Sequence, residues 1–77
     1  MIQVRFFAAA REAAGTSSEQ RSEGSVGDLR AALVRDHPAL GAVLGHCALL
    51  VDGVRRDDAF ALDQAELVDV LPPFAGG

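Results

Sequence analysis

The feature that most restricts the fold is a single strong amphipathic helix in a chain of 77 residues. Ser25 can cap its start, and Asp28 follows three residues later, as in a capping box with Asp in place of Glu. The helix should end before Pro38, because the residue before a proline disfavours the α region. Its apolar stripe comprises Val26, Leu29, Ala32 and Leu33. One such helix can cover one face of one sheet, so we expect a two-layer α+β domain.

The N-terminal segment is predicted to be a strand, because apolar and polar residues alternate along most of residues 2–7. Ile2, Val4 and Phe6 then face the core. Phe7 is left on the outer face, where it either packs under a neighbouring segment or belongs to a surface for a partner.

Between this strand and the main helix, the sequence favours a short helix and a polar strand. Residues 8–14 are rich in alanine, and Gly15 can end the helix. Residues 19–22 indicate a weak strand, which would form a hairpin with the first strand through a long connection. This half of the chain therefore supplies two strands before the main helix begins.

The segment after the main helix contains a strong hairpin signal. Residues 38–45 can hold one more helical turn, and residues 48–51 are short and apolar, as expected of a central strand. Asp52 and Gly53 favour a two-residue turn into a return strand at residues 54–56. The two strands of this hairpin must be antiparallel.

Residues 66–71 are predicted to be the last strand, with Val68 and Val70 facing the core. A helical crossover joins parallel strands, whereas a tight hairpin joins antiparallel ones, so the sheet should be mixed. These are the ingredients of a β-grasp, or ubiquitin-like, fold, although the pattern also permits other small α+β folds. We divide the chain into a β-grasp domain at residues 1–71 and a flexible tail at residues 72–77.

The tail has the sequence Pro-Pro-Phe-Ala-Gly-Gly. Pro72 and Pro73 fix φ and remove two backbone donors, so the sheet ladder should stop there. Gly76 and Gly77 leave almost no steric bulk around the terminal carboxylate. Six extended residues reach at most about 20 Å. Such an end is suited to entering a narrow enzyme channel.

Charge and composition exclude several classes of function. The formal net charge is −4, with seven cations, all of them arginine, against eleven acids. This balance argues against nucleic-acid binding and suits a partner with a basic groove. No apolar run has the length of a membrane span, and no signal peptide is evident. One cysteine excludes an internal disulfide, so we expect a reducing, cytoplasmic location.

A search for catalytic or metal-binding groups finds no cluster. His37 and His46 lie nine residues apart and are interpreted as surface histidines. Cys47 is interpreted as a small buried hydrophobe, and Asp57-Asp58 as a solvated turn. We therefore expect no metal and no bound cofactor. The distinctive chemical group of the chain is its C-terminal carboxylate.

Several of these residues also carry a resemblance to a known family. Phe6-Phe7-Ala8, Arg11-Glu12, Gly15 and the end from Val70 to Gly77 resemble the small subunit of molybdopterin synthase. That subunit is the sulfur carrier of molybdenum cofactor synthesis, and its family has the β-grasp fold. The resemblance covers the whole chain, and the terminal Pro-Pro-x-x-Gly-Gly is its most specific part.

The resemblance implies a carrier that is not an enzyme on its own but the small subunit of a sulfurtransferase complex. An adenylating enzyme would use ATP to activate the Gly77 carboxylate, and a desulfurase or rhodanese-type donor would convert it to a thiocarboxylate. The thiocarboxylate would donate sulfur to cyclic pyranopterin monophosphate in the large subunit. Two small and two large subunits would form a heterotetramer. Gly76 would keep the approach to the reacting carbon open.

The resemblance, together with the outward apolar residues, also implies a surface for the partners. Arg11 matches a family arginine that would help to dock the activating enzyme. Two departures stand out: Arg55 replaces a residue that is often aliphatic, and Gln64-Ala65 replaces an Asp-Gly turn. The predicted partner interface comprises Phe7, Arg11, Leu71, Pro72, Pro73, Phe74 and Ala75.

Other readings of the Gly-Gly end remain open at this point. One is a sulfur carrier for thiamine or cysteine synthesis, although thiamine carriers usually lack the Pro-Pro-Phe-like lead. Another is a ubiquitin-like protein modifier or a non-covalent adaptor. The absence of lysine forbids lysine-linked chains of this protein, but it does not forbid attachment to other proteins.

Overall fold

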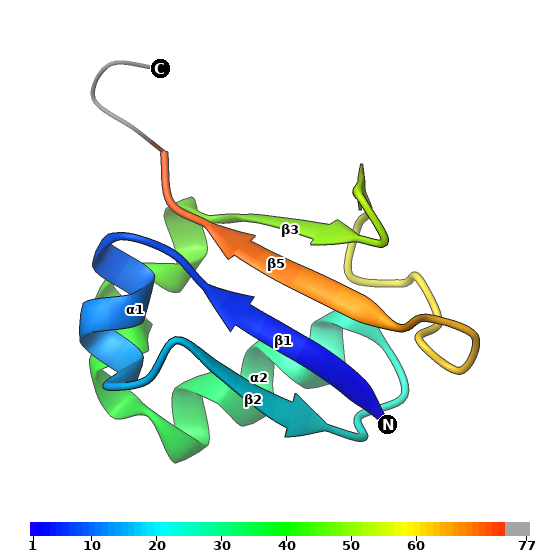
Figure 1. Cartoon of the computed structure of the whole chain (residues 1–77), viewed down its shortest axis with the longest axis horizontal. Helices are drawn as coiled ribbons and strands as arrows, with labels where there is room; N and C mark the ends of the chain where they lie inside the picture. Colours follow the sequence, from blue (N-terminus) through cyan, green and yellow to red (C-terminus); the bar gives the residue numbers. More distant parts are fainter. Residues whose placement is uncertain (74–77) are drawn as a thin grey trace.

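The computed structural model describes residues 1–73 and contains a five-stranded mixed sheet packed on one main helix (Figure 1). The strands are β1 (Ile2–Phe6), β2 (Ser18–Arg21), β3 (Ala48–Val51), β4 (Val54–Arg55) and β5 (Leu67–Leu71). The helices are α1 (Ala9–Ala14), α2 (Val26–Asp36) and the 3₁₀ helices η1 (Pro38–Ala42) and η2 (Leu44–His46). The predicted β-grasp fold is confirmed, and the predicted strand and α-helix bounds differ from these by at most one residue at either end.

Strand β5 occupies the middle of the sheet, whose order is β2-β1-β5-β3-β4. It runs parallel to β1, with Phe6 opposite Val70, and antiparallel to β3, with Ala48 opposite Leu71. The sequence favoured β3 as the central strand, but β3 lies between β5 and β4. The chain inserts its last strand between β1 and β3, where both neighbours supply hydrogen bonds. Because β1 and β5 are parallel, both end at the same edge of the sheet (Figure 1).

Helix α2 begins and ends where the sequence predicts. The Ser25 hydroxyl accepts a hydrogen bond from the Asp28 backbone N–H at 3.1 Å, which satisfies one free donor of the first turn. The Phe60 and Asp58 carbonyls accept hydrogen bonds from the next two N–H groups, those of Val26 and Gly27. The approach at Gly27 is close, since a Cβ there would lie 3.1 Å from the Asp58 oxygen.

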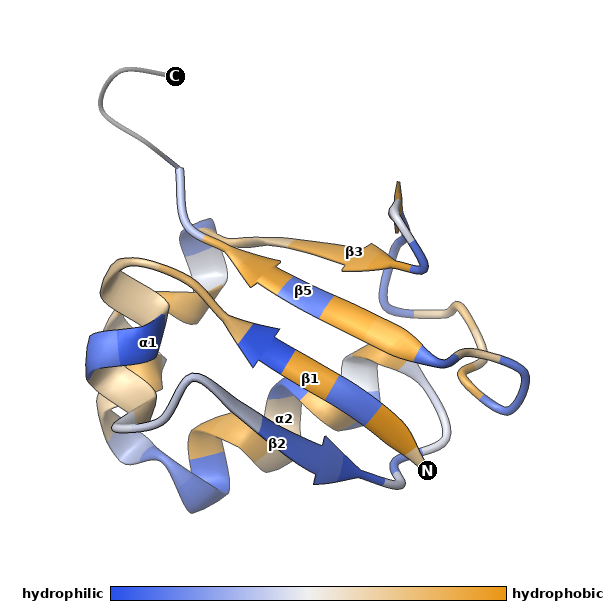
Figure 2. Cartoon of the chain, in the orientation of Figure 1, coloured by the Kyte–Doolittle hydropathy of each residue, from blue (hydrophilic) through white to orange (hydrophobic). Residues whose placement is uncertain are grey.

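The core lies between α2 and the inner face of the sheet. In Figure 2, apolar colour dominates β5 and β3 and alternates with polar colour along β1, whereas the edge strand β2 is polar. The 3₁₀ helices close one end of the core with Leu40 and Leu44. Phe60, predicted to be in the core, is half-buried. The largest fully buried side chains include Phe6, Leu29, Leu33, Leu40, Leu44 and Leu49.

The β3–β4 hairpin turns at Asp52 and Gly53, as predicted, with φ values of 48° and 86°. Positive φ at both turn residues matches the twist of the flanking strands. The Asp52 carboxylate also accepts a hydrogen bond from the Leu67 N–H at 2.9 Å. This contact fastens the hairpin to the first residue of β5.

Arg21 joins β2 to the end of α2 through a cluster of acids. Its guanidinium lies 3.0 Å from a Glu19 oxygen, 2.8 Å from a Glu23 oxygen and 2.8 Å from an Asp36 oxygen. Hydrogen bonds from Arg35 and Arg21 hold the pKa of Asp36 at about 2, below its ordinary value. A hydrogen bond from Arg21 likewise lowers the pKa of Glu23. Both carboxylates are therefore more acidic in the folded chain.

Replacing Arg21 with Met is expected to destabilise the domain at neutral pH and to weaken its pH dependence in acid. A depressed folded-state pKa gives stability that is present above the ordinary carboxyl pKa near 4 and is lost as the pH falls toward about 2. Loss of these partly buried contacts should lower the unfolding midpoint by roughly 5–10 °C at pH 7. Circular dichroism melts between about pH 2 and pH 7 measure both effects.

Arg35→Met is the matched control. The Arg35 side chain is 70% exposed, whereas that of Arg21 is 12% exposed, so this variant should shift the neutral midpoint far less. Equal shifts in the two variants would show that Arg21 does not hold β2 against α2.

Candidate functional site

The sheet face that points away from α2 is uncovered within residues 1–73. No helix of this part of the chain lies in front of β1, β5 and β3 in Figure 1. Its side chains alternate with the buried ones and are half-buried or exposed. We call this surface the outer face, and its members on the three strands are Gln3, Arg5, Ala48, Leu50, Leu67, Asp69 and Leu71.

The tail begins at the end of β5, and we call Leu71, Pro72 and Pro73 the tail root. Leu71 is half-buried, Pro72 is buried and Pro73 is exposed. A shallow hollow beside the tail root is lined by His46, Ala48, Arg55, Leu71, Pro72 and Pro73. The predicted site residues Phe74, Ala75, Gly76 and Gly77 lie outside the described residues.

Phe7 lies at the same end of the sheet as the tail root. Its N–H donates a hydrogen bond to the Val70 carbonyl at 3.2 Å, which places it next to the end of β5. Its side chain is half-buried, and the Arg5 guanidinium lies 5.5 Å from the centre of its ring. The structure thus brings Phe7 beside Leu71, although the two residues are far apart in the sequence.

Arg11 is exposed on α1 and lies close to this end of the sheet as well. It lines a hollow together with Phe7 and with Arg5 of the outer face. The backbone turns sharply before α1, where Ala8 has a φ of 52°. Arg11 follows this turn on α1 and lies near the end of β1.

The outer face also contains a charged pair that the sequence reasoning missed. The Arg5 guanidinium donates two hydrogen bonds to the Asp69 carboxylate, at 2.7 and 3.0 Å. This bidentate contact raises the pKa of Arg5. The signal available in the sequence was an outward cation in one strand and an outward acid in another. It becomes a pair only once β1 and β5 are known to be neighbours.

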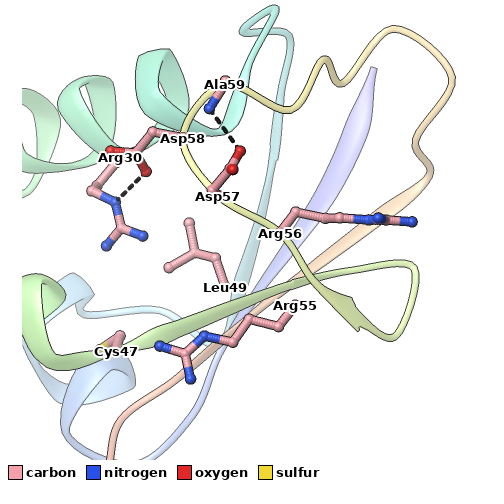
Figure 3. A pocket seen from close by; sticks show the side chains of 8 residues that line it. All are labelled: Arg30, Cys47, Leu49, Arg55, Arg56, Asp57, Asp58 and Ala59. Atoms are coloured by element: carbon pink, nitrogen blue, oxygen red, sulfur yellow. Dashed lines mark hydrogen bonds and ion pairs between the residues drawn. The ribbon is translucent and has the colours of Figure 1, made fainter.

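A third hollow lies between α2 and the segment around β4, and Figure 3 shows its lining. Cys47 faces this hollow but is 5% exposed, and its thiol lies 3.3 Å from the Val43 carbonyl oxygen. Burial raises the pKa of the Cys47 thiol, so the thiol stays protonated at neutral pH. Arg30 donates hydrogen bonds to Asp58 at 3.2 Å and to the Leu44 carbonyl at 3.0 Å. The interpretation of Cys47 as a small buried hydrophobe agrees with this geometry.

Within residues 1–73, no group of three or more His, Cys, Asp and Glu side chains could hold a metal ion. His37 Nε2 lies 2.7 Å from Oε1 of Glu19, and the His37 ring packs edge-on to Phe6. His46 is exposed at the end of η2. No helix in this described part is long and apolar enough to cross a membrane. The candidate site in this part of the chain is the outer face together with the tail root.

The fold and this site define the class: a ubiquitin-like β-grasp protein whose C-terminal tail starts at the end of the central strand of the sheet, beside a partly apolar surface. The model of the ThiS family matches residues 4–77, and the chain belongs to this family.

Several relatives match over nearly their whole length. The chain is 37% identical over 81 aligned residues to the molybdopterin synthase sulfur carrier subunit of Chlamydomonas reinhardtii, covering 99% of this chain and 98% of the relative. It is 28% identical to the small archaeal modifier protein 1 of Methanosarcina acetivorans, with a TM-score of 0.83 over 99% of this chain and 95% of the other. Subunits 1 and 2 of the molybdopterin-converting factor from Helicobacter pylori form a solved complex. One chain of it is 25% identical, with a TM-score of 0.73 over 99% of this chain and 97% of the other.

Proposed function

We propose that this protein is the sulfur carrier of molybdopterin synthesis and that Gly77 carries the sulfur. The observation that supports this most is the family match, which extends through residue 77 and so includes the Gly-Gly end. The relative that is 37% identical is itself named a molybdopterin synthase sulfur carrier subunit. The geometry is compatible, because the tail starts from the central strand of the sheet, beside a half-apolar surface.

The proposed loading reaction starts with an unreactive group, since a carboxylate has no usable leaving group. In an adenylating enzyme, the Gly77 carboxylate attacks the α-phosphorus of ATP and displaces pyrophosphate. The outer sulfur of a cysteine persulfide on the donor then attacks the acyl carbon and displaces AMP. A second thiol cleaves the resulting S–S bond, which leaves the thiocarboxylate on Gly77 and a disulfide on the donor. Gly76 leaves room for this attack because it has no side chain.

The proposed unloading reaction takes place in the large subunit. The thiocarboxylate sulfur attacks a carbon of cyclic pyranopterin monophosphate and displaces an oxygen substituent from it, which forms a thioester between the carrier and the pterin. Water then cleaves the bond between the acyl carbon and sulfur, so that the sulfur stays on the pterin and the carboxylate of the carrier is restored. The dithiolene needs two sulfurs, so two loaded carriers are consumed for each molybdopterin. A heterotetramer of two small and two large subunits is the proposed assembly. The chain binds no cofactor in this scheme, and ATP is used by the activating enzyme.

The predicted interface serves this scheme as a docking surface. Phe7 and Leu71 would pack against the partner at the tail root, with Phe74 extending the same surface. Pro72 and Pro73 would direct the tail into the partner, and Ala75 to Gly77 would enter its active site. Arg11 would contact the activating enzyme. The half-burial of Phe7 and Leu71 supports the proposal, because a partner could remove their remaining apolar surface from water.

The test is an intact-mass measurement after incubation with ATP, the adenylating enzyme and a sulfur source. Exchange of one oxygen for sulfur at the C-terminus is the expected result. Without such exchange, every sulfur-carrier reading would fail. Addition of the large subunit and the pyranopterin precursor then tests the pathway. Exchange without molybdopterin formation would move the proposal to a carrier for thiamine or cysteine synthesis.

A second candidate function is that of a protein modifier, which the similarity to small archaeal modifier protein 1 favours. Here an amine of a target protein, instead of a persulfide, would attack the acyl-adenylate and form an isopeptide bond. ATP-dependent adducts of higher mass in a lysate would support this function. Their absence, together with sulfur exchange in the purified system, would leave the carrier function alone.

A further inference from the structure

The seven arginines of the chain differ in the ion pairs, hydrogen bonds and aromatic contacts that their guanidinium groups form. Within residues 1–73, Arg21, Arg30 and Arg35 form ion pairs near α2, Arg5 pairs with Asp69, and Arg56 lies 4.5 Å from the centre of the Phe60 ring. For Arg11 and Arg55, the described part of the chain provides no ion pair, side-chain hydrogen bond or aromatic contact. Among residues 1–73, these are the two guanidinium groups for which the chain supplies no such contact.

Both uncommitted arginines lie near the edge where the tail starts, but on different sides of it. Arg11 lines the hollow next to Phe7, at the end of β1. Arg55 lines the hollow that contains Leu71, Pro72 and Pro73, beside β3. Strands β1 and β4 are separated by β5 and β3, which corresponds to roughly 14 Å between strand axes. The apolar surface of Phe7 and Leu71 thus has an available cation on each side.

In the family that the chain resembles, the position of Arg55 is often aliphatic. The structure places this charged side chain next to the tail root. Arg55 is exposed and lines both the hollow at the tail root and the hollow below α2. Figure 3 shows Arg55 and Arg56 extending in opposite directions from the same short segment. The hollow at the tail root is lined by Arg55 and not by Arg56.

We propose that Arg55 is a specificity-determining residue that binds an Asp or Glu carboxylate on the large subunit that receives the tail. This inference rests on the proposed function. A planar guanidinium pairs with a carboxylate through two parallel hydrogen bonds, which fixes orientation as well as adding affinity. The chain as a whole is acidic and is expected to suit a partner with a basic groove, so a pair between Arg55 and a partner carboxylate has the opposite polarity to the general attraction between the two proteins. It sets the register of docking, which is the main effect of paired charges at the rim of an interface.

The position of Arg55 indicates that the anion belongs to the large subunit itself and not to the substrate bound by that subunit. The six residues from 72 to 77 reach up to about 20 Å when extended. A substrate phosphate held near Gly77 would then lie at the far end of the tail, away from Arg55. The group that meets Arg55 belongs to the surface that surrounds the tail root.

The experiment compares Arg55→Glu with Arg56→Glu, using the full chain and the large molybdopterin synthase subunit of the same organism. Both variants change the net charge by the same amount at adjacent positions. By calorimetry in about 0.1 M salt, Arg55→Glu should weaken binding at least about tenfold, and Arg56→Glu less than about threefold. Arg55→Gln should lose part of the affinity and most of its dependence on salt. Thermal melts of each variant confirm that the domain is folded.

Two outcomes of this experiment would overturn the proposed role of Arg55. Equal weakening by Arg55→Glu and Arg56→Glu would overturn it, because only overall charge would then matter. Slower thiocarboxylate formation by Arg55→Glu with unchanged binding to the large subunit would also overturn it, since the carboxylate would then belong to the activating enzyme. Neither result would affect the proposed carrier function. Absence of sulfur exchange or of binding in the unmodified chain would overturn the function and this inference together.

Discussion

Deletion of Gly77 is expected to reduce sulfur transfer at least about 100-fold while leaving the thermal unfolding midpoint unchanged. Removing one residue pulls the carboxylate back by roughly 3.5 Å, and a misplacement of about 1 Å can already cost that much rate. The fold should not respond, because the last strand ends at Leu71 and the core lies between α2 and the sheet. Intact mass after loading, molybdopterin yield and a circular dichroism melt measure these quantities.

Two further variants separate length from bulk at the end of the tail. Gly77→Ala keeps the length but adds a methyl group beside the reacting carbon, so loading should slow without a change in stability. Ala75→Gly also keeps the length and adds no bulk beside the reacting carbon, so it should slow loading less than Gly77→Ala, and any loss of transfer that it shows measures the contact of the Ala75 methyl group with the partner. A large loss of stability in the Gly77 deletion would contradict the division into a folded domain and a reactive tail.

Phe6→Ala and Phe7→Ala are expected to have opposite consequences, although the chemical change is identical. Phe6 is 2% exposed and contributes the largest side chain of β1 to the core. Its truncation should cost about 3–5 kcal/mol, a large part of the stability of so small a domain. Phe7 is half-buried at the end of β1, so its truncation should cost less than about 1.5 kcal/mol. Urea unfolding measures both free energies.

The binding result should separate the two variants in the other direction. Phe7→Ala should weaken association with the large subunit at least about tenfold, because a partner buries the remaining surface of an aromatic side chain at low entropic cost. Phe6→Ala should bind normally in whatever fraction remains folded. If Phe7→Ala loses as much stability as Phe6→Ala, Phe7 belongs to the core. If its affinity is unchanged, Phe7 lies outside the interface.

Local patterns in the sequence were sufficient to predict most of the elements. Alternation placed Val4 and Phe6 inward, and helical spacing with the Ser25 cap located α2. The turn at Asp52-Gly53 followed from the need for positive φ at both positions. These features depend on side-chain periodicity and on backbone sterics within a few residues, so they can be read without knowledge of the rest of the chain.

The candidate site was predictable in part. The Gly-Gly end, Arg11, Phe7 and Leu71 could be named from the sequence, and the structure brings the last three to one edge of the sheet. The Arg5–Asp69 pair could not be named, because its members are 64 positions apart. Whether an outward cation meets an outward acid depends on which strands are neighbours and in which register, and periodicity within one strand does not contain that information.

The sequence by itself therefore determined the class of fold, the polarity of each face and the chemistry of the tail, all of which depend on local spacing and residue type. Only the tertiary structure decided that β5 lies between β1 and β3, and hence that the tail starts from the middle of the sheet. The same pairing set Phe7 beside Leu71 and left Arg55 next to the tail root. These neighbours are fixed by hydrogen bonds and packing between segments that are distant in the chain, and such contacts exist only after the sheet has assembled.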